Sequence, residues 1–208
     1  FSQIFEPLQI PWTLRFFLVY SVSVFASAIP AVLVIIVVRD YLGLFDHLGL
    51  FLSLYFLSGV ISLPLWTYLA KTFSKVAAWR MSMTLAAFTF VWAFFLEPGD
   101  YVYYLLICLF SGFALGADLS LPPSILTDRI AEFNEEKQSA RYFAILTFLN
   151  KASLALASGL ALPILGFWGL EAGAPVNGNA QLVLVITYAL IPSILKLSVA
   201  WFGGCYLR

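Results

Sequence analysis

The sequence predicts an all-α membrane protein with six transmembrane helices. Of its 208 residues, 62% are hydrophobic and 11% are charged, whereas soluble domains carry about 25% charged residues. The apolar residues also gather into long runs. Because a helix needs about 20 apolar residues to cross roughly 30 Å of hydrocarbon, and because lipid offers peptide groups no hydrogen-bond partners, such runs predict membrane-spanning helices.

Six runs meet this length requirement. They fall at residues 16–38, 48–70, 76–96, 101–127, 142–165 and 181–203. Short polar segments separate them, and none is long enough to be a further domain. We expect a lead-in segment at residues 1–13 and a six-helix bundle at residues 14–208. Since the sequence starts at Phe1 and not at Met, we expect a fragment, a processed chain or a partly traced one.

The basic residues fall almost entirely on one side of this predicted bundle. Six crossings make the connecting segments alternate sides, which leaves Arg39 alone on one side. The other side holds Arg15, Lys71, Lys75, Arg80, Arg129, Lys137, Arg141 and Arg208. By the positive-inside rule, we expect that side and both termini to be cytoplasmic.

Three ionisable residues remain well inside predicted spans: Asp118, Lys151 and Lys196. A charge at mid-bilayer costs at least about 2.5 to 3.5 kcal/mol, so each needs a partner or a function. Lys196 precedes the end of its span by seven residues, about 10 Å. We therefore expect its long side chain to reach toward the cytoplasmic membrane surface.

Asp118 and Lys151 lie at equal depth on consecutive antiparallel spans, each nine residues from a cytoplasmic end, or about 13 Å. This predicts either an ion pair that fixes packing or two charges that border one aqueous cavity. Thr147 and Asn150 extend a polar stripe beside Lys151 on one helix face. We name Asp118, Thr147, Asn150 and Lys151 as the candidate solute or coupling path. Neutralising Lys151 should impair transport more than neutralising Lys196.

Other chemistry finds little support in the sequence. Its one histidine, His47, falls in a predicted loop, and Cys108 and Cys205 fall toward opposite membrane faces, which predicts free thiols and no metal site. No nucleophile with a base and no glycine-rich phosphate loop is present in the sequence, so we expect no catalytic residues and no enzyme. A net charge of zero predicts no nucleic-acid partner. Gly112 and Gly116 form a small-xxx-small pair that predicts a closely packed neighbouring helix.

Three segments carry a resemblance to a known family. They read YFLSGVISLPLWTYLAKTFSK at 55–75, CLFSGFALGADLSLPPSILTD at 108–128 and ARYFAILTFLNKASLALASGL at 140–160. They resemble the glycoside-pentoside-hexuronide:cation symporters, the melibiose permease-like branch of the major facilitator superfamily. Their order and spacing align the whole chain with that family's carboxy-terminal six helices. The resemblance implies one half of a major facilitator superfamily fold and symport of a sugar with Na⁺ or H⁺.

The resemblance also implies roles for single residues. Lys151 matches the family's lysine in the eleventh helix, near its sugar and cation sites, and Thr147 matches a sugar-contact position. Asp128 matches an acid that closes the tenth helix at the cytoplasmic side. We expect a cytoplasmic gate made of charged contacts that break and re-form during transport. Its members are Lys75, Asp128, Arg129 and Arg141.

Two departures from the family pattern concern the solute. Leu119 and Leu146 stand where melibiose permease has a tryptophan and a glutamine. The sugar is therefore not expected to be melibiose itself. In the family the cation-binding carboxylates are on the first six helices, so we expect the coupling ion to bind mainly outside this chain, with no other cofactor.

Two hypotheses follow. The first is that the chain is the carboxy-terminal bundle of a cation-coupled transporter for a sugar or related small polar solute. Its partners would be the lipid bilayer, the solute and a second six-helix bundle, because alternating access rocks two bundles about a central site. It would lie in the bacterial inner (plasma) membrane. The second is a transport-inactive structural or assembly subunit, packed against other membrane subunits, that keeps a half-transporter fold.

Overall fold

The computed structural model describes residues 7–170 and 178–206, without the side chains of Cys205 and Tyr206. Part of the predicted lead-in segment, Arg208 and the Cys205 thiol therefore lie outside the described residues. Six helices within the described ranges are long and apolar enough to cross a membrane, which confirms the predicted all-α class and the number of crossings.

Each crossing is one long helix or a helix continued by a short irregular turn. In chain order they are α1 (Pro11–Ile36) with the π-helical η2 (Val37–Tyr41); η3 (Phe45–His47) with α2 (Leu48–Thr72); α3 (Lys75–Ala93); α4 (Tyr101–Glu132); η4 (Glu136–Gln138) with α5 (Ser139–Phe167); and α6 (Gly178–Val185), the π-helical η5 (Ile186–Leu190) and α7 (Ile191–Tyr206).

The π-helical turn in the last crossing has a local cause in the sequence. Pro192 follows η5 and has no backbone N–H, so the regular bond to the carbonyl of Tyr188 cannot form. The turn places the Tyr188 hydroxyl 3.0 Å from that of Tyr104 on α4. Both side chains are buried, and their hydrogen bond connects the last crossing to α4.

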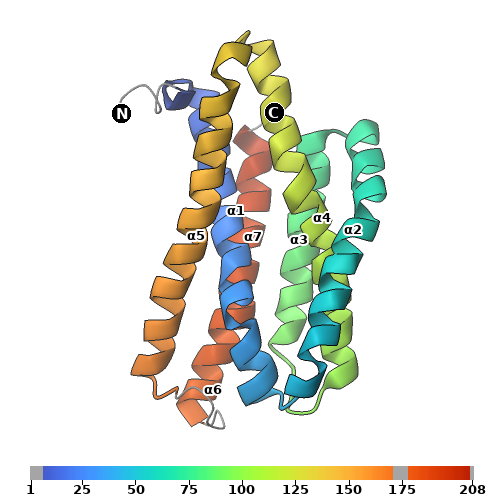
Figure 1. Cartoon of the computed structure of the whole chain (residues 1–208), viewed down its shortest axis with the longest axis vertical. Helices are drawn as coiled ribbons and strands as arrows, with labels where there is room; N and C mark the ends of the chain where they lie inside the picture. The colour runs from blue at the N-terminus through green and yellow to red at the C-terminus, as the bar shows by residue number, and fades with distance from the viewer. Residues whose placement is uncertain (1–6, 171–177, 207–208) are drawn as a thin grey trace.

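The α4 helix is longer than the predicted span that ended at residue 127. Its 32 residues correspond to about 48 Å, well beyond the roughly 30 Å of hydrocarbon. The last turn remains helical because Ile130 packs into the core while Asp128 stays exposed. Figure 1 shows α4 and α5 projecting past the other helices at the end where α1 begins. Asp128 and Arg129 thus lie on a helical extension at this end of the bundle.

The six crossings form an open series of neighbours (Figure 1). α5 packs against α1, α1 against α7, α7 against α3, α3 against α4, and α4 against α2. α5 and α2 therefore stand at the two ends of the series. α4 and α5, although consecutive in the chain, hardly touch.

The closest helix approach in this series is between α2 and α4. A Cβ atom on Gly112 would lie 2.1 Å from the carbonyl oxygen of Tyr55, and one on Gly116 would lie 2.5 Å from that of Gly59. Such distances leave no space for a larger side chain. The predicted packing role of Gly112 and Gly116 is confirmed, and α2 is their partner.

The interior contains two hydrophobic clusters separated along the membrane normal. One includes Phe16 and Trp79 near the basic end, and the other includes Phe51 and Tyr104 near the opposite end. On α1, Ser23 and Ser27 fall between the segments that supply the two clusters. The interior thus has a polar layer between two apolar ones, and this layer contains two of the intramembrane charges.

Candidate solute and coupling site

The centre of the polar layer is an ion pair between Asp118 on α4 and Lys196 on α7. The lysine Nζ lies 2.5 Å from Asp118 Oδ2. The Lys196 side chain is only 3% exposed and that of Asp118 is 19% exposed. Two ions removed from water are stable only when they compensate each other and keep further hydrogen bonds.

Those further bonds come from two other helices. Trp79 on α3 donates its Nε1–H to Asp118 Oδ1 at 3.1 Å, and Ser27 on α1 donates to Oδ2 at 3.4 Å. Lys196 donates to Ser23 Oγ at 2.9 Å. Ser23 and Ser27 are four residues apart and therefore share one face of α1. The network joins α1, α3, α4 and α7 at one point in the membrane.

One expectation from the sequence is wrong here, and so is one of the two alternatives offered for Asp118 and Lys151. Lys196 does not reach toward the membrane surface, because its ammonium lies buried against Asp118 and Ser23. Asp118 does not pair with Lys151, because α4 packs between α2 and α3 while α5 lies beyond α1. Equal depth on consecutive helices gave no information about which helices become neighbours.

Asp118 and Ser27 also line a cavity that extends away from the ion pair toward the end opposite the basic one. Its volume is about 160 Å³. The remaining wall is mostly apolar and aromatic, with hydroxyl groups from Tyr55, Ser111 and Tyr104. A site for a small molecule usually measures about 300 to 1,000 Å³, so this bundle alone encloses only part of such a volume.

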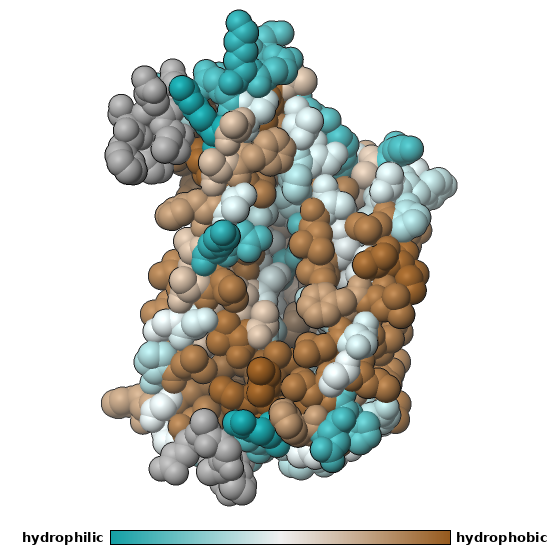
Figure 2. All heavy atoms as spheres, viewed as in Figure 1, coloured by the Kyte–Doolittle hydropathy of each residue, from teal (hydrophilic) through white to brown (hydrophobic). Residues whose placement is uncertain are grey.

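The other predicted residues form an exposed stripe on α5. Thr147, Asn150 and Lys151 are all exposed, and Phe148 and Leu154 beside them are 65% and 49% exposed. Asn150 donates to the Tyr20 hydroxyl on α1 at 3.5 Å. The Lys151 side chain makes no ion pair or hydrogen bond with any other residue in the described ranges. Figure 2 shows a hydrophilic group over α5 within the hydrophobic band of the bundle.

The position of this stripe along α5 matters, because Lys151 lies near the midpoint of the membrane-crossing segment. Lys151 lies 15 residues from Glu136 and 16 from Phe167, the two ends of this membrane-crossing segment. It therefore lies well inside the membrane-crossing segment, where an uncompensated charge is costly. A charged side chain inside a membrane helix needs water or a polar partner around it.

The four predicted gate residues are at the basic end but form separate contacts. Lys75 at the start of α3 lies 2.6 Å from Asp128 on α4. Arg129 lies 2.5 Å from Glu132 and sits 4.9 Å above the ring of Trp12 on α1. Arg141 donates to the Gln138 side chain at 3.0 Å.

The Lys75–Asp128 ion pair joins α3 to α4. The contact of Arg129 with the Trp12 ring joins α4 to α1 through a cation–π interaction. The Arg141 contact with Gln138 stays within the first turn of its own helix and the preceding η4. The structure thus brings Lys75 and Asp128 together. Their role in gating remains a prediction.

Four members of the central network were not among the predicted functional residues: Ser23, Ser27, Trp79 and Lys196. Lys196 carried a usable signal, since it is an ion inside a span and Asp118 needed a cation. The i, i+4 spacing of the two serines is a weaker signal, because hydroxyl groups in membrane helices commonly bond to their own backbone. Trp79 carried no signal. Among the described residues, no cluster of three His, Cys, Asp or Glu side chains could hold a metal ion.

Comparison with known proteins adds one finding to this geometry. A family model described as MFS/sugar transport protein matches residues 3–206, which is nearly the whole chain. No curated protein matches the chain. The family match agrees with the six apolar helices and with polar groups placed inside a membrane-spanning bundle.

Proposed function

Because the chain belongs to the MFS/sugar transport protein family, we propose that it is the carboxy-terminal bundle of a cation-coupled transporter for a sugar or related small polar solute. The six helices correspond to one half of the major facilitator superfamily fold, in which two six-helix halves rock about a central site. A second bundle would cover the polar face of α5 and enclose the solute.

One observation carries this proposal: Lys151 is exposed at the centre of its membrane-crossing helix. A charge in contact with lipid there costs at least about 2.5 to 3.5 kcal/mol. A water-filled path removes that cost. Thr147, one turn away on the same face, adds a hydroxyl that can bond to a sugar hydroxyl, and the Lys151 ammonium adds three donors.

Asp118 has a different proposed role. Its charge is balanced by Lys196, so it is a poor sole ligand for a coupling cation. We therefore place Na⁺ or H⁺ mainly on carboxylates of the second bundle. Asp118 and Ser27 line the inner wall of the cavity, where they offer hydrogen bonds to solute or water. The end of the bundle with Lys75, Asp128, Arg129 and Arg141 we place in the cytoplasm of a bacterial cell.

The test measures whether water and solute reach the α5 stripe. Thr147→Cys should react with a membrane-impermeant thiol reagent in the assembled transporter, because thiolate chemistry requires water, and bound solute should slow the reaction. Phe88→Cys is a matched control, since Phe88 is 60% exposed on α3 but is apolar and faces lipid in this proposal.

Two outcomes contradict the proposal. If Thr147→Cys is as unreactive as Phe88→Cys, the stripe is covered by protein, and the structural-subunit hypothesis gains. If it reacts without protection by any sugar, the stripe is wet but does not bind solute. Uptake measured against Na⁺ and H⁺ gradients then tests the coupling ion separately.

A further inference from the structure

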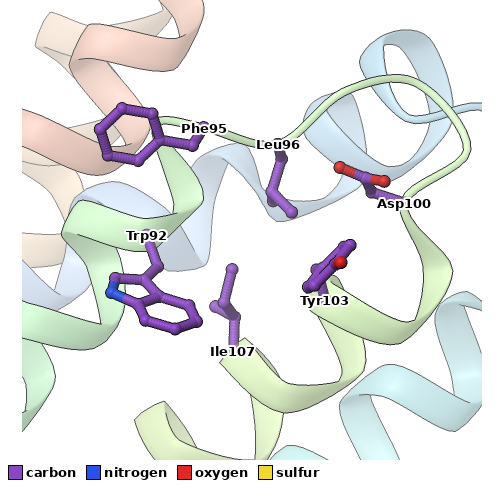
Figure 3. A pocket seen from close by; sticks show the side chains of 6 residues that line it. All are labelled: Trp92, Phe95, Leu96, Asp100, Tyr103 and Ile107. Carbon is purple, nitrogen blue, oxygen red and sulfur yellow. The ribbon is translucent and has the colours of Figure 1, made fainter.

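The surface of α3 and α4 carries a groove near the end opposite the basic one (Figure 3). A hollow of about 260 Å³ is lined by Trp92, Phe95, Leu96, Asp100, Tyr103 and Ile107. A second hollow of about 220 Å³ shares Trp92 and Ile107 with the first and reaches Leu85 and Phe110. The shared walls place the two hollows next to each other along the two helices, and together they are called here the α3–α4 groove.

The length of the groove matches one leaflet of a bilayer. From Leu85 to Phe95 the groove follows ten residues of chain, which is about 15 Å if the helical rise continues to its end. Half of the hydrocarbon thickness is also about 15 Å. Trp92 and Phe95 are 65% and 72% exposed, so the walls of the groove are open to the surroundings of the bundle. An extended acyl chain of one leaflet fits this shape.

The outer end of the groove is acidic. Asp100 lines it, and the exposed Glu97 lies in the same turn between α3 and α4. Asp100 Oδ2 accepts the backbone N–H of Glu97 at 2.8 Å, which fixes the carboxylate at the groove mouth. Arg39 at this end of the bundle is 2.6 Å from its own neighbour Asp40. The mouth therefore favours a cationic group that donates hydrogen bonds.

We propose that the α3–α4 groove is a binding site for an aminophospholipid. Its acyl chain lies along Trp92 and Ile107, and its primary ammonium group lies at Asp100 and Glu97. A primary ammonium carries three N–H donors and a positive charge, and carboxylate oxygens accept both kinds of interaction. A choline headgroup keeps the charge but has no N–H donor, and a glycerol headgroup leaves the phosphate charge uncompensated.

Native mass spectrometry of the purified transporter with three lipids of identical acyl chains tests the proposal. Retention should fall in the order phosphatidylethanolamine, phosphatidylcholine, phosphatidylglycerol. Asp100→Asn should reduce the preference for ethanolamine over choline about two- to fivefold, the range for a partly exposed ion pair. The asparagine oxygen can still accept the Glu97 N–H, so the turn is kept. Asp46→Asn, at an exposed carboxylate of the same end, is the control and should change nothing.

A second pair of variants tests the acyl chain. Trp92→Ala should lower retention of all three lipids, because it removes a wall shared by both hollows. Phe167→Ala removes an aromatic ring that is 86% exposed on α5 and should leave retention unchanged. Equal retention of ethanolamine and choline lipids, preference for the glycerol lipid, or equal behaviour of the two aromatic variants would overturn the proposal.

Discussion

Lys196 and Lys151 are two lysines deep in the same bundle, and their environments are opposite. Lys196 is buried where four helices meet, with a carboxylate at 2.5 Å and a serine hydroxyl at 2.9 Å. Lys151 is exposed at the centre of α5 and has no ionic partner among the described residues. The cost of a charge in hydrocarbon is met within the chain for the first and has to be met from outside it for the second. The environment of the buried lysine fits a role in packing, and that of the exposed lysine fits the solute path proposed above.

The largest expected effect is on stability at the buried pair. Lys196→Met leaves Asp118 buried without its counter-ion, which should lower the free energy of unfolding by about 3 to 5 kcal/mol. The double variant Asp118→Asn with Lys196→Met removes both charges and should recover most of this loss, since an uncharged pair needs no compensation. Thermal unfolding of the parent, the single variants Lys196→Met and Asp118→Asn, and the double variant measures the coupling.

The contrast between the two lysines fails if the stability losses of the Asp118 and Lys196 single variants add up in the double variant. Additive losses would mean that Asp118 and Lys196 do not compensate each other. Solute uptake by the double variant then tests whether the pair serves packing or transport. Retained uptake with restored stability would assign the pair to packing alone, and lost uptake would support the proposed place of Asp118 in the solute path.

The next effect concerns transport and not stability. Lys151→Met should weaken solute uptake about 10- to 100-fold, which corresponds to the loss of a hydrogen bond from a charged group. Its unfolding midpoint should hardly change, because the side chain has no ion pair or hydrogen bond to lose within the described part of the chain. Lys71→Met, at an exposed lysine of the basic end, is the matched control and should transport normally.

A Lys151→Met variant that transports at the parent rate would contradict the proposed role of α5. So would a large drop in its unfolding midpoint, because that would show a buried partner for Lys151 in the assembled protein. Either result would reverse the contrast between the two lysines.

The sequence was sufficient for the features that depend on the solvent. The length of the apolar runs predicted six helices, and the cost of buried charge drew attention to Asp118 and Lys196, which form an ion pair inside the bundle. What it lacked was helix adjacency. α4 packs tightly on α2 because Gly112 and Gly116 admit the backbone of Tyr55 and Gly59, and this places α4 away from α5.

That single packing fact decides the partner of Asp118. Depth along a helix follows from residue counting at 1.5 Å per residue, but the direction in which a side chain points depends on which neighbour its helix accepts. The pairing of Asp118 with Lys196, 78 residues away, was therefore open from the sequence alone. The α5 stripe was easier to predict, because i, i+4 neighbours share a face whatever the helix packs against.

Glycine substitutions test the packing half of the comparison. Gly112→Ala should destabilise the bundle by about 1 to 3 kcal/mol, because its Cβ would lie 2.1 Å from the Tyr55 carbonyl oxygen and the helices must separate. Gly159→Ala on α5 meets nothing within 4 Å and should be neutral or slightly stabilising. Unfolding midpoints of the two variants give the difference. Equal midpoints would mean that α2 and α4 are less closely packed than described.

The smallest expected effect belongs to the exposed ion pair of the basic end. Lys75 and Asp128 are 2.6 Å apart, as close as the buried pair, but their side chains are 35% and 59% exposed. Water screens such a pair, so Lys75→Met should cost only about 0.2 to 1 kcal/mol of stability. The exchanged variant Lys75→Asp with Asp128→Lys should restore it.

Transport by these variants distinguishes a gate from a surface contact. If the contact breaks and re-forms in each cycle, Lys75→Met should change the rate of uptake while the apparent solute affinity stays constant, and the exchanged variant should return the rate toward that of the parent. A rate that does not change in either variant would leave Lys75 and Asp128 as an ordinary surface pair. Since the separation of the charges is nearly the same at the two sites, a several-fold smaller stability loss here than at Lys196 would show that burial, not distance, sets the strength of an ion pair in this bundle.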